Sequence, residues 1–150
     1  MRRKDRQIDR NAAIINLNKG EYGILSTVDI YGQPYGVPLN FCVENDKIYI
    51  HCATSGKKIK NISQNVKVSF CVVGNTFVLP DKFSTKYKST IVTGIVEEVY
   101  DDEKQHALES ILKKYSSAYF VEGLKYIEEL FQKTRVFRIN IQSITGKSNG

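Results

Sequence analysis

Residues 35–65 of the chain read YGVPLNFCVENDKIYIHCATSGKKIKNISQN and contain the pattern that decides the fold. Two alternating runs, YGVPLNFCVE and IYIHCA, flank a short turn at Asn45-Asp46, which predicts a β-hairpin. Pro38 within the first run indicates an edge strand or a bulge, because proline cannot donate to a central ladder. The alternation breaks at Ser55-Gly56, and a short helix is expected over residues 57–64.

One face of this hairpin is predicted to belong to the core. If the turn centres on Asn45-Asp46, paired residue numbers sum to 91, so Asn40 lies opposite His51 and Leu39 opposite Cys52. The apolar face then holds Val37, Leu39, Phe41, Val43, Ile48, Ile50 and Cys52. The opposite face is mixed and holds Pro38, Asn40, Tyr49, His51 and Ala53. A slip of one residue would exchange the two faces.

Lys57 and Lys58 stand in the first turn of the short helix. Cations are unfavourable beside the positive N-terminal end of a helix dipole. A bound anion would remove this conflict, and phosphate is the usual one. The half-polar sheet face that leads to these lysines resembles a floor for a planar, phosphorylated ligand. A solvated turn with incidental lysines is the alternative that the spacing leaves open, since SGKK is no Walker motif.

The rest of the chain alternates between strand and helix patterns. Helices are expected over residues 5–19, 101–116 and 120–133, the last weakened by Gly123. Strands are expected over 20–30, 35–44, 48–53, 66–74, 88–100 and 134–147, with Gly94 as a bulge candidate. Residues 75–87 read as irregular. Six strands, mostly with hairpin-length connections, argue against a doubly wound parallel sheet and favour an antiparallel barrel with helices outside.

Length and composition are typical of one ordinary domain spanning 1–150. No apolar run approaches the roughly 20 residues that cross a bilayer, and MRRKDRQIDR is not a secretory signal, so a cytoplasmic location is expected. Three cysteines without a CxxC pair are expected to be free thiols, not zinc ligands. The net charge of +6 indicates an anionic partner, although scattered lysines mixed with acids argue against nucleic acid.

The order of these segments resembles the FMN-binding split barrel of the pyridoxamine 5′-phosphate oxidase-like superfamily. Four segments carry the resemblance, from Ile8 to Lys147: GILSTVDIYGQPYGVPLNF, IYIHCATSGKKIKNI, YKSTIVTGIVEEV and the ending ITGK. The last is similar to the nitroimidazole-resistance (Nim-like) branch. The resemblance implies a mainly β, α+β domain: a six-stranded antiparallel split β-barrel with flanking helices. It also implies bound FMN and a homodimer with FMN at the interface.

Site residues follow from the resemblance position by position. It implies that Val37, Pro38, Leu39 and Asn40 lie along the flavin ring, partly through backbone groups. It places His51 and Cys52 near the ribityl chain and ring, Lys57 and Lys58 on the phosphate, and Ser89, five residues before Gly94, at a cofactor-facing polar position.

His51 is the candidate catalytic residue, for proton delivery, because histidine titrates near neutral pH. A histidine that only hydrogen-bonds to a neighbour or to the cofactor is the alternative.

The resemblance implies an FMN-dependent oxidoreductase that reduces a small electron-poor substrate, such as a nitroaromatic, with a nicotinamide donor. Oxidation of vitamin B6 phosphate is not expected, because the C-terminal arginine and histidine of those oxidases have no counterpart and the chain has no tryptophan. Two alternatives remain open: a flavin- or haem-binding split barrel without turnover, and a basic barrel that stacks single-stranded nucleic acid on aromatic side chains.

Overall fold

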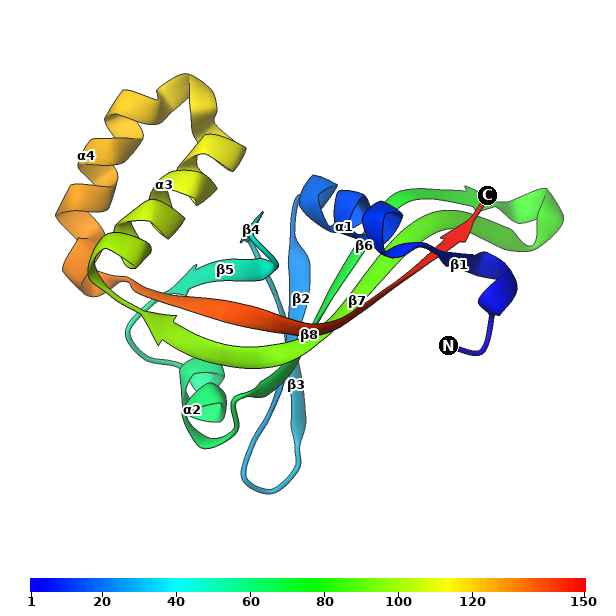
Figure 1. The fold of residues 1–150 in the computed structure, drawn as a ribbon, viewed down its shortest axis with the longest axis horizontal. Coiled ribbons are helices and arrows are strands. Elements are labelled where there is room, and N and C mark those ends of the chain that lie inside the picture. The colour runs from blue at the N-terminus through cyan, green and yellow to red at the C-terminus, as the bar shows by residue number, and fades with distance from the viewer.

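A computed structural model describes residues 1–150 and shows one antiparallel sheet with helices packed around it (Figure 1). The strands are β1 (Gln7–Ile8), β2 (Gly23–Val28), β3 (Pro34–Leu39), β4 (Cys42–Glu44), β5 (Lys47–Cys52), β6 (Lys67–Leu79), β7 (Ser84–Val99) and β8 (Arg135–Asn149). The α-helices are α1 (Arg10–Lys19), α2 (Lys57–Gln64), α3 (Asp101–Ser116) and α4 (Phe120–Leu130).

The sheet curls because its two end strands are neighbours in the chain. The strand order is β3-β2-β6-β7-β8-β5-β4, with β1 added to β8, so β3 and β4 are the two ends. Seven strands laid flat would place these ends roughly 29 Å apart at about 4.8 Å per strand. Only Asn40 and Phe41 connect them, a span of roughly 10 Å at full extension. The connection therefore forces the sheet to bend round into a split barrel, which confirms the expected fold class.

The predicted hairpin register is confirmed where the two strands pair. Cys42 pairs with Tyr49, Val43 with Ile48 and Glu44 with Lys47, each pair summing to 91. The register does not continue to Asn40–His51 and Leu39–Cys52, which is a correction. The strand breaks after Leu39: β3 leaves to pair with β2, while His51 and Cys52 pair with Val136 and Arg135 of β8.

The sheet has eight strands instead of six. One extra strand arises because the expected strand over 35–44 divides into β3 and β4. The other is β1, whose Gln7 and Ile8 pair with β8. The first helix consequently begins at Arg10, where the Asp9 carboxylate accepts a hydrogen bond from the Ala12 N–H at 2.8 Å.

Residues 75–87 are not irregular but extend β6 and β7 into a projecting hairpin. The alternation is interrupted because Asn75 has φ 53° and the register shifts between Gly74 and Phe77. The expected bulge at Gly94 is confirmed by a register shift after Thr93. A Cβ at Gly94 would lie 2.4 Å from the Asn140 carbonyl oxygen, so the bend requires glycine.

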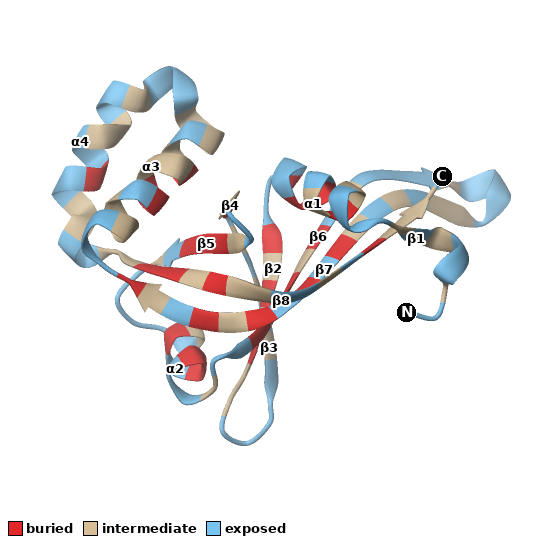
Figure 2. Cartoon of the chain, viewed as in Figure 1, coloured by how far each residue is buried: buried red, intermediate tan, exposed pale blue.

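Two apolar cores hold the elements together (Figure 2). The larger fills the barrel and includes Phe41, Ile48 and Ile50 from the predicted apolar face of the hairpin. The smaller lies where α3 and α4 cover one end of the outer sheet surface, and it includes Tyr49 and Val136. The mixed face of β5 is therefore partly covered by helices and is not an open floor.

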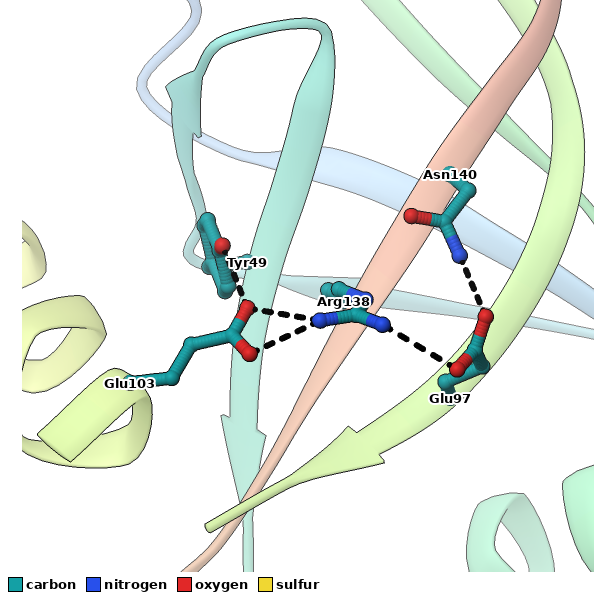
Figure 3. A network of polar contacts seen from close by, with 5 residues as sticks. All are labelled: Tyr49, Glu97, Glu103, Arg138 and Asn140. Carbon is teal, nitrogen blue, oxygen red and sulfur yellow. Dashed lines mark hydrogen bonds and ion pairs between the residues drawn. The ribbon is translucent and has the colours of Figure 1, made fainter. Parts of the chain in front are cut away.

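A polar network fastens the start of α3 to the sheet (Figure 3). The Glu103 carboxylate accepts hydrogen bonds from the Tyr49 hydroxyl at 2.8 Å and from Arg138 Nη1 at 2.7 and 2.9 Å. Arg138 Nη2 donates to Glu97, which also accepts from the Asn140 amide. Side chains of β5, β7 and β8 thus set the position of α3.

Candidate functional site

The two adjacent lysines lie where the sequence places them, in the first turn of α2. Gly56 precedes the helix with φ 141°, and no side chain caps the N-terminus. The first turn contains no acidic residue, and none of the ion pairs in the structure involves Lys57 or Lys58. The helix-initiating N–H groups and the two lysines of the first turn stand at one corner of the fold, a setting that suits an anion.

Lys57 also contacts β3. Its Nζ atom lies 5.0 Å from the centroid of the Tyr35 ring, within the range of a cation–π contact. The corner at α2 is therefore adjacent to the edge strand whose other residues were predicted to lie along a planar ligand.

β3 is one end of the sheet, so one side of its backbone has no strand partner. Val37 and Leu39 pack against the barrel core, while Pro38 and Asn40 are exposed. A ligand beside β3 would meet the backbone groups of Val37 and Leu39 and the side chains of Pro38 and Asn40. The expectation that backbone groups take part in binding stays a prediction.

His51 stands near the end of β5 with an exposed side chain. Partial removal from water lowers the pKa of its imidazole, and the nearby Lys58 ammonium lowers the same pKa further. The imidazole is therefore neutral at neutral pH, with one nitrogen that donates and one that accepts. A neutral ring can relay a proton or orient a ligand, so proton delivery stays a prediction.

The cysteine thiols are poorly suited to nucleophilic chemistry. Cys52 packs against the core, and burial raises the pKa of its thiol. Burial, with a smaller effect of Glu44, raises the pKa of Cys42 to about 12. All three thiols are free. Because the thiolate is the reactive form, Cys52 could serve a ligand through backbone and shape only.

Ser89 is separated from the other predicted residues within one chain. His51 pairs with Val136, which pairs with Val99, and Ser89 lies ten residue steps from Val99 along β7. This is roughly 33 Å along the strand at about 3.3 Å per residue. Ser89 shares the outer sheet surface with Pro38, but the structure does not bring it to His51 or Lys58.

Sequence reasoning missed two features of the site. Arg135 pairs with Cys52, donates to the Thr54 carbonyl at 3.4 Å and binds Glu98 at 2.6 Å, so it supports the turn before α2. A charged residue at the start of an apolar strand was the signal. The second feature is a cavity between the sheet and the α3–α4 pair, lined in part by Asn40 and His51. Only the three-dimensional structure brings its walls together.

No group of three or more His, Cys, Asp or Glu side chains is placed to hold a metal ion. None of the four α-helices has the length and apolar content that a membrane crossing requires.

Comparisons with known proteins agree with this geometry. A candidate 5-nitroimidazole antibiotic resistance protein from Bacteroides thetaiotaomicron is 26% identical, with 94% of this chain and 85% of that one covered and a TM-score of 0.77. An FAD-binding protein from Mesorhizobium loti is 25% identical over 97% and 98% of the two chains, with a TM-score of 0.72. A search of curated proteins gave no match.

More distant structures share the fold alone. An FAD and haem binding protein from Mycobacterium smegmatis is 19% identical over 97% of this chain and 74% of that one, with a TM-score of 0.83. The family model for pyridoxamine 5′-phosphate oxidase matches residues 9–148, which include every strand of the sheet except β1 and the last residue of β8. On this match and the split-barrel topology, the chain belongs to the pyridoxamine 5′-phosphate oxidase family.

Proposed function

We propose that the protein binds FMN and that the corner formed by Lys57, Lys58 and the N-terminus of α2 holds the phosphate. The observation that carries this proposal is the pair of lysines in the first turn of α2, neither of them in an ion pair, with no acid in that turn and no side chain capping the helix N-terminus. A dianion there would be stabilised by the helix dipole and would pair with both ammonium groups. Membership in the family supports the same ligand.

The flavin ring would then extend from α2 along β3 toward Asn40 and His51. The unpaired edge of β3 offers backbone groups to the ring, and Pro38 offers a flat apolar contact. A bound flavin supplies hydride and electron transfer. His51 would hold a proton at one imidazole nitrogen, and the lysines would orient the cofactor through its phosphate.

The activity that this arrangement supports best is reduction of a small electron-poor substrate by a nicotinamide donor. The support comes from the 26% identical relative described as a candidate 5-nitroimidazole resistance protein. Nitroaromatic compounds are accordingly the first substrates to test.

Replacing Lys57 and Lys58 together with alanine tests the cofactor assignment. Each charge-assisted contact to a phosphate contributes about 1.5–3 kcal/mol, so FMN affinity should fall at least about 100-fold. Riboflavin lacks the phosphate, so its affinity should change less than about threefold. Quenching of flavin fluorescence measures both dissociation constants.

Lys60→Ala/Lys67→Ala is the matched control. It removes the same net charge from exposed positions, the fourth residue of α2 and the first residue of β6, and leaves Lys57 and Lys58 in place. This variant should bind FMN like the unmodified protein. An equal loss for FMN and riboflavin in the Lys57/Lys58 variant would contradict the phosphate assignment.

A flavin carrier without turnover is the second candidate. The FAD-binding relative from Mesorhizobium loti, 25% identical over nearly both full lengths, favours binding without naming a reaction. Steady-state oxidation of NADH or NADPH by the FMN-loaded protein, with a nitroaromatic acceptor, separates the two candidates. Turnover supports an enzyme, and its absence with full FMN occupancy supports a carrier.

A further inference from the structure

A cavity of about 290 Å³ lies between the end of the sheet and the α3–α4 pair. Its floor includes Asn40 and His51, and its walls come from both helices. His51 therefore lies between the cavity and the N-terminus of α2. It lines the cavity, and the nearby charge of Lys58 lowers the pKa of its imidazole. A molecule in the cavity would lie beside a flavin ring that extends from α2 to His51.

The cavity is uncharged. None of its twelve lining residues is lysine, arginine, aspartate or glutamate, and seven are hydrophobic. The imidazole of His51 is neutral at neutral pH because its pKa is lowered. An ionised group in such surroundings loses its hydration without gaining a partner, which is strongly unfavourable. The lining therefore favours neutral molecules and disfavours phosphorylated or carboxylated ones.

Two of the polar side chains that line the cavity already have hydrogen-bond partners within the protein. The Tyr115 hydroxyl already donates to the Glu21 carbonyl at 2.7 Å and accepts from the Phe41 N–H at 3.1 Å. The Thr134 hydroxyl donates to the Leu130 carbonyl at 2.9 Å. The His51 imidazole, the Asn40 amide and the Ser116 and Tyr126 hydroxyls have no such partner. His51 and Asn40 lie together on the sheet side, next to the proposed flavin site, and both can donate a hydrogen bond to an acceptor on a ligand.

The volume limits the ligand to about one substituted ring. An apolar cavity of about 150 Å³ holds benzene, so about 290 Å³ accommodates a ring with small substituents. Close packing of the two helices keeps the cavity this small: a Cβ at Gly123 of α4 would lie 2.2 Å from Leu112 Cδ1 of α3.

We propose that this cavity is the substrate subsite and that the substrate is an uncharged, single-ring molecule whose hydrogen-bond acceptor group faces His51 and Asn40. The assignment as a substrate subsite rests on the flavin function proposed above. The prediction that the cavity binds a neutral ring depends only on the cavity lining, so it can be tested without the cofactor.

The test compares two probes of similar size in FMN-free protein: neutral 4-nitrobenzyl alcohol and anionic 4-nitrobenzoate. Amide chemical shifts of isotope-labelled protein give the location and the dissociation constant of each. The alcohol should bind at least about tenfold more tightly than the benzoate, with shifts centred on α3, α4 and Thr134. Equal affinities, or shifts elsewhere, would overturn the proposal.

Ser116→Phe places a ring in the cavity, since Ser116 lines it. This variant should bind the alcohol at least about tenfold more weakly, whereas Ser117→Phe, at the adjacent exposed residue outside the cavity, should bind within about twofold of the original. Unchanged binding in a folded Ser116→Phe protein would overturn the proposal. If Ser116→Phe fails to fold in a thermal melt, the shift map of the unmodified protein decides.

FMN affinity, measured separately, distinguishes the two proposals. If FMN binds but the alcohol does not, the cavity assignment falls and the flavin function stands. If the alcohol binds but FMN does not, the flavin function and the role of the cavity as a substrate subsite are both contradicted. The result then supports only the proposal that the cavity binds a neutral ring.

Discussion

At the scale of single residues, His51 shows how the fold changes the chemistry expected from the sequence. An unperturbed histidine titrates near pH 6.5, which motivated the role in proton delivery. In the structure, partial removal from water and the Lys58 charge lower its pKa, so the folded state favours the neutral ring. The folded protein therefore binds fewer protons at this site than the unfolded chain over the range between the two pKa values.

This difference predicts a pH-dependent loss of stability. The contribution of His51 is fully present above about pH 6.5 and is lost as the pH falls toward its lower folded pKa. His51→Gln removes the titration, so its unfolding free energy relative to the unmodified protein should rise as the pH is lowered from about 7.5 to 5. Urea unfolding across this range measures the difference. A difference independent of pH would contradict the lowered pKa.

The sequence predicts proximity along the chain better than proximity across the sheet. The pattern of 47–65 placed His51, Lys57 and Lys58 in one short segment, and in the structure Lys58 is near enough to lower the pKa of His51. The sequence could not show that Ser89 lies far from His51, because the distance between the two residues depends on which strands pair and in which register. Nor could it reveal Arg135, whose contact with Thr54 joins segments 81 residues apart.

At the scale of elements, the anchoring of α3 depends on Glu103. Burial alone would raise the pKa of this carboxyl, but hydrogen bonds from Tyr49 and Arg138 outweigh it and lower the pKa. Arg138 Nε is buried without a partner, so the guanidinium already lacks one of its possible hydrogen bonds. Loss of Glu103 would leave it with Glu97 alone.

Glu103→Ala should therefore lower the free energy of unfolding by about 1–2 kcal/mol. This value allows for solvent screening, because the Arg138 and Glu103 side chains are 25% and 35% exposed. Asp102→Ala is the matched control, since Asp102 is an exposed acid in the same turn and outside the network. Its effect should stay below about 0.5 kcal/mol. Urea unfolding of both variants checks this, and equal effects would show that general charge near the helix start is responsible.

Regular helices were predictable from the sequence, whereas strand continuity was not. The bounds of the helices over 57–64 and 101–116 match the structure, because local signals determine them: the break at Ser55-Gly56 before the first helix, and an acidic start with apolar spacing in the second. The segment 75–87 was misjudged because its side chains are largely exposed, so no buried face imposes alternation. Its strand character comes from pairing between β6 and β7.

At the scale of the whole molecule, much of the outer sheet surface is left uncovered. Pairing aligns Pro38, Ile24, Cys71, Ile91 and Thr145 in one row across β3, β2, β6, β7 and β8. Ile91 is 47% exposed and Val73, in the next row, is 57% exposed. α1 packs on the opposite surface, where Thr90 donates to the Ala13 carbonyl. We propose that a second copy of the chain covers this surface and brings Ser89 to a shared site.

Sedimentation velocity should accordingly give twice the chain mass of 17.1 kDa. Ile91→Lys places a charge at the centre of the surface and should shift the protein to the monomer, because a buried unpaired charge opposes association. Val121→Lys on α4, where Val121 is 68% exposed and away from this surface, should remain dimeric. A monomeric unmodified protein at micromolar concentration would contradict the proposed homodimer.

The connection between β7 and β8 has a consequence for how such proteins diversify. Val99 and Val136 face each other across a continuous ladder, so α3 and α4 form an excursion that leaves the sheet and returns to the point of departure. Mutations, insertions and deletions within this excursion would reshape the cavity and leave the barrel and the N-terminus of α2 intact. One scaffold can in this way acquire new ligand preferences by evolving about a quarter of its length.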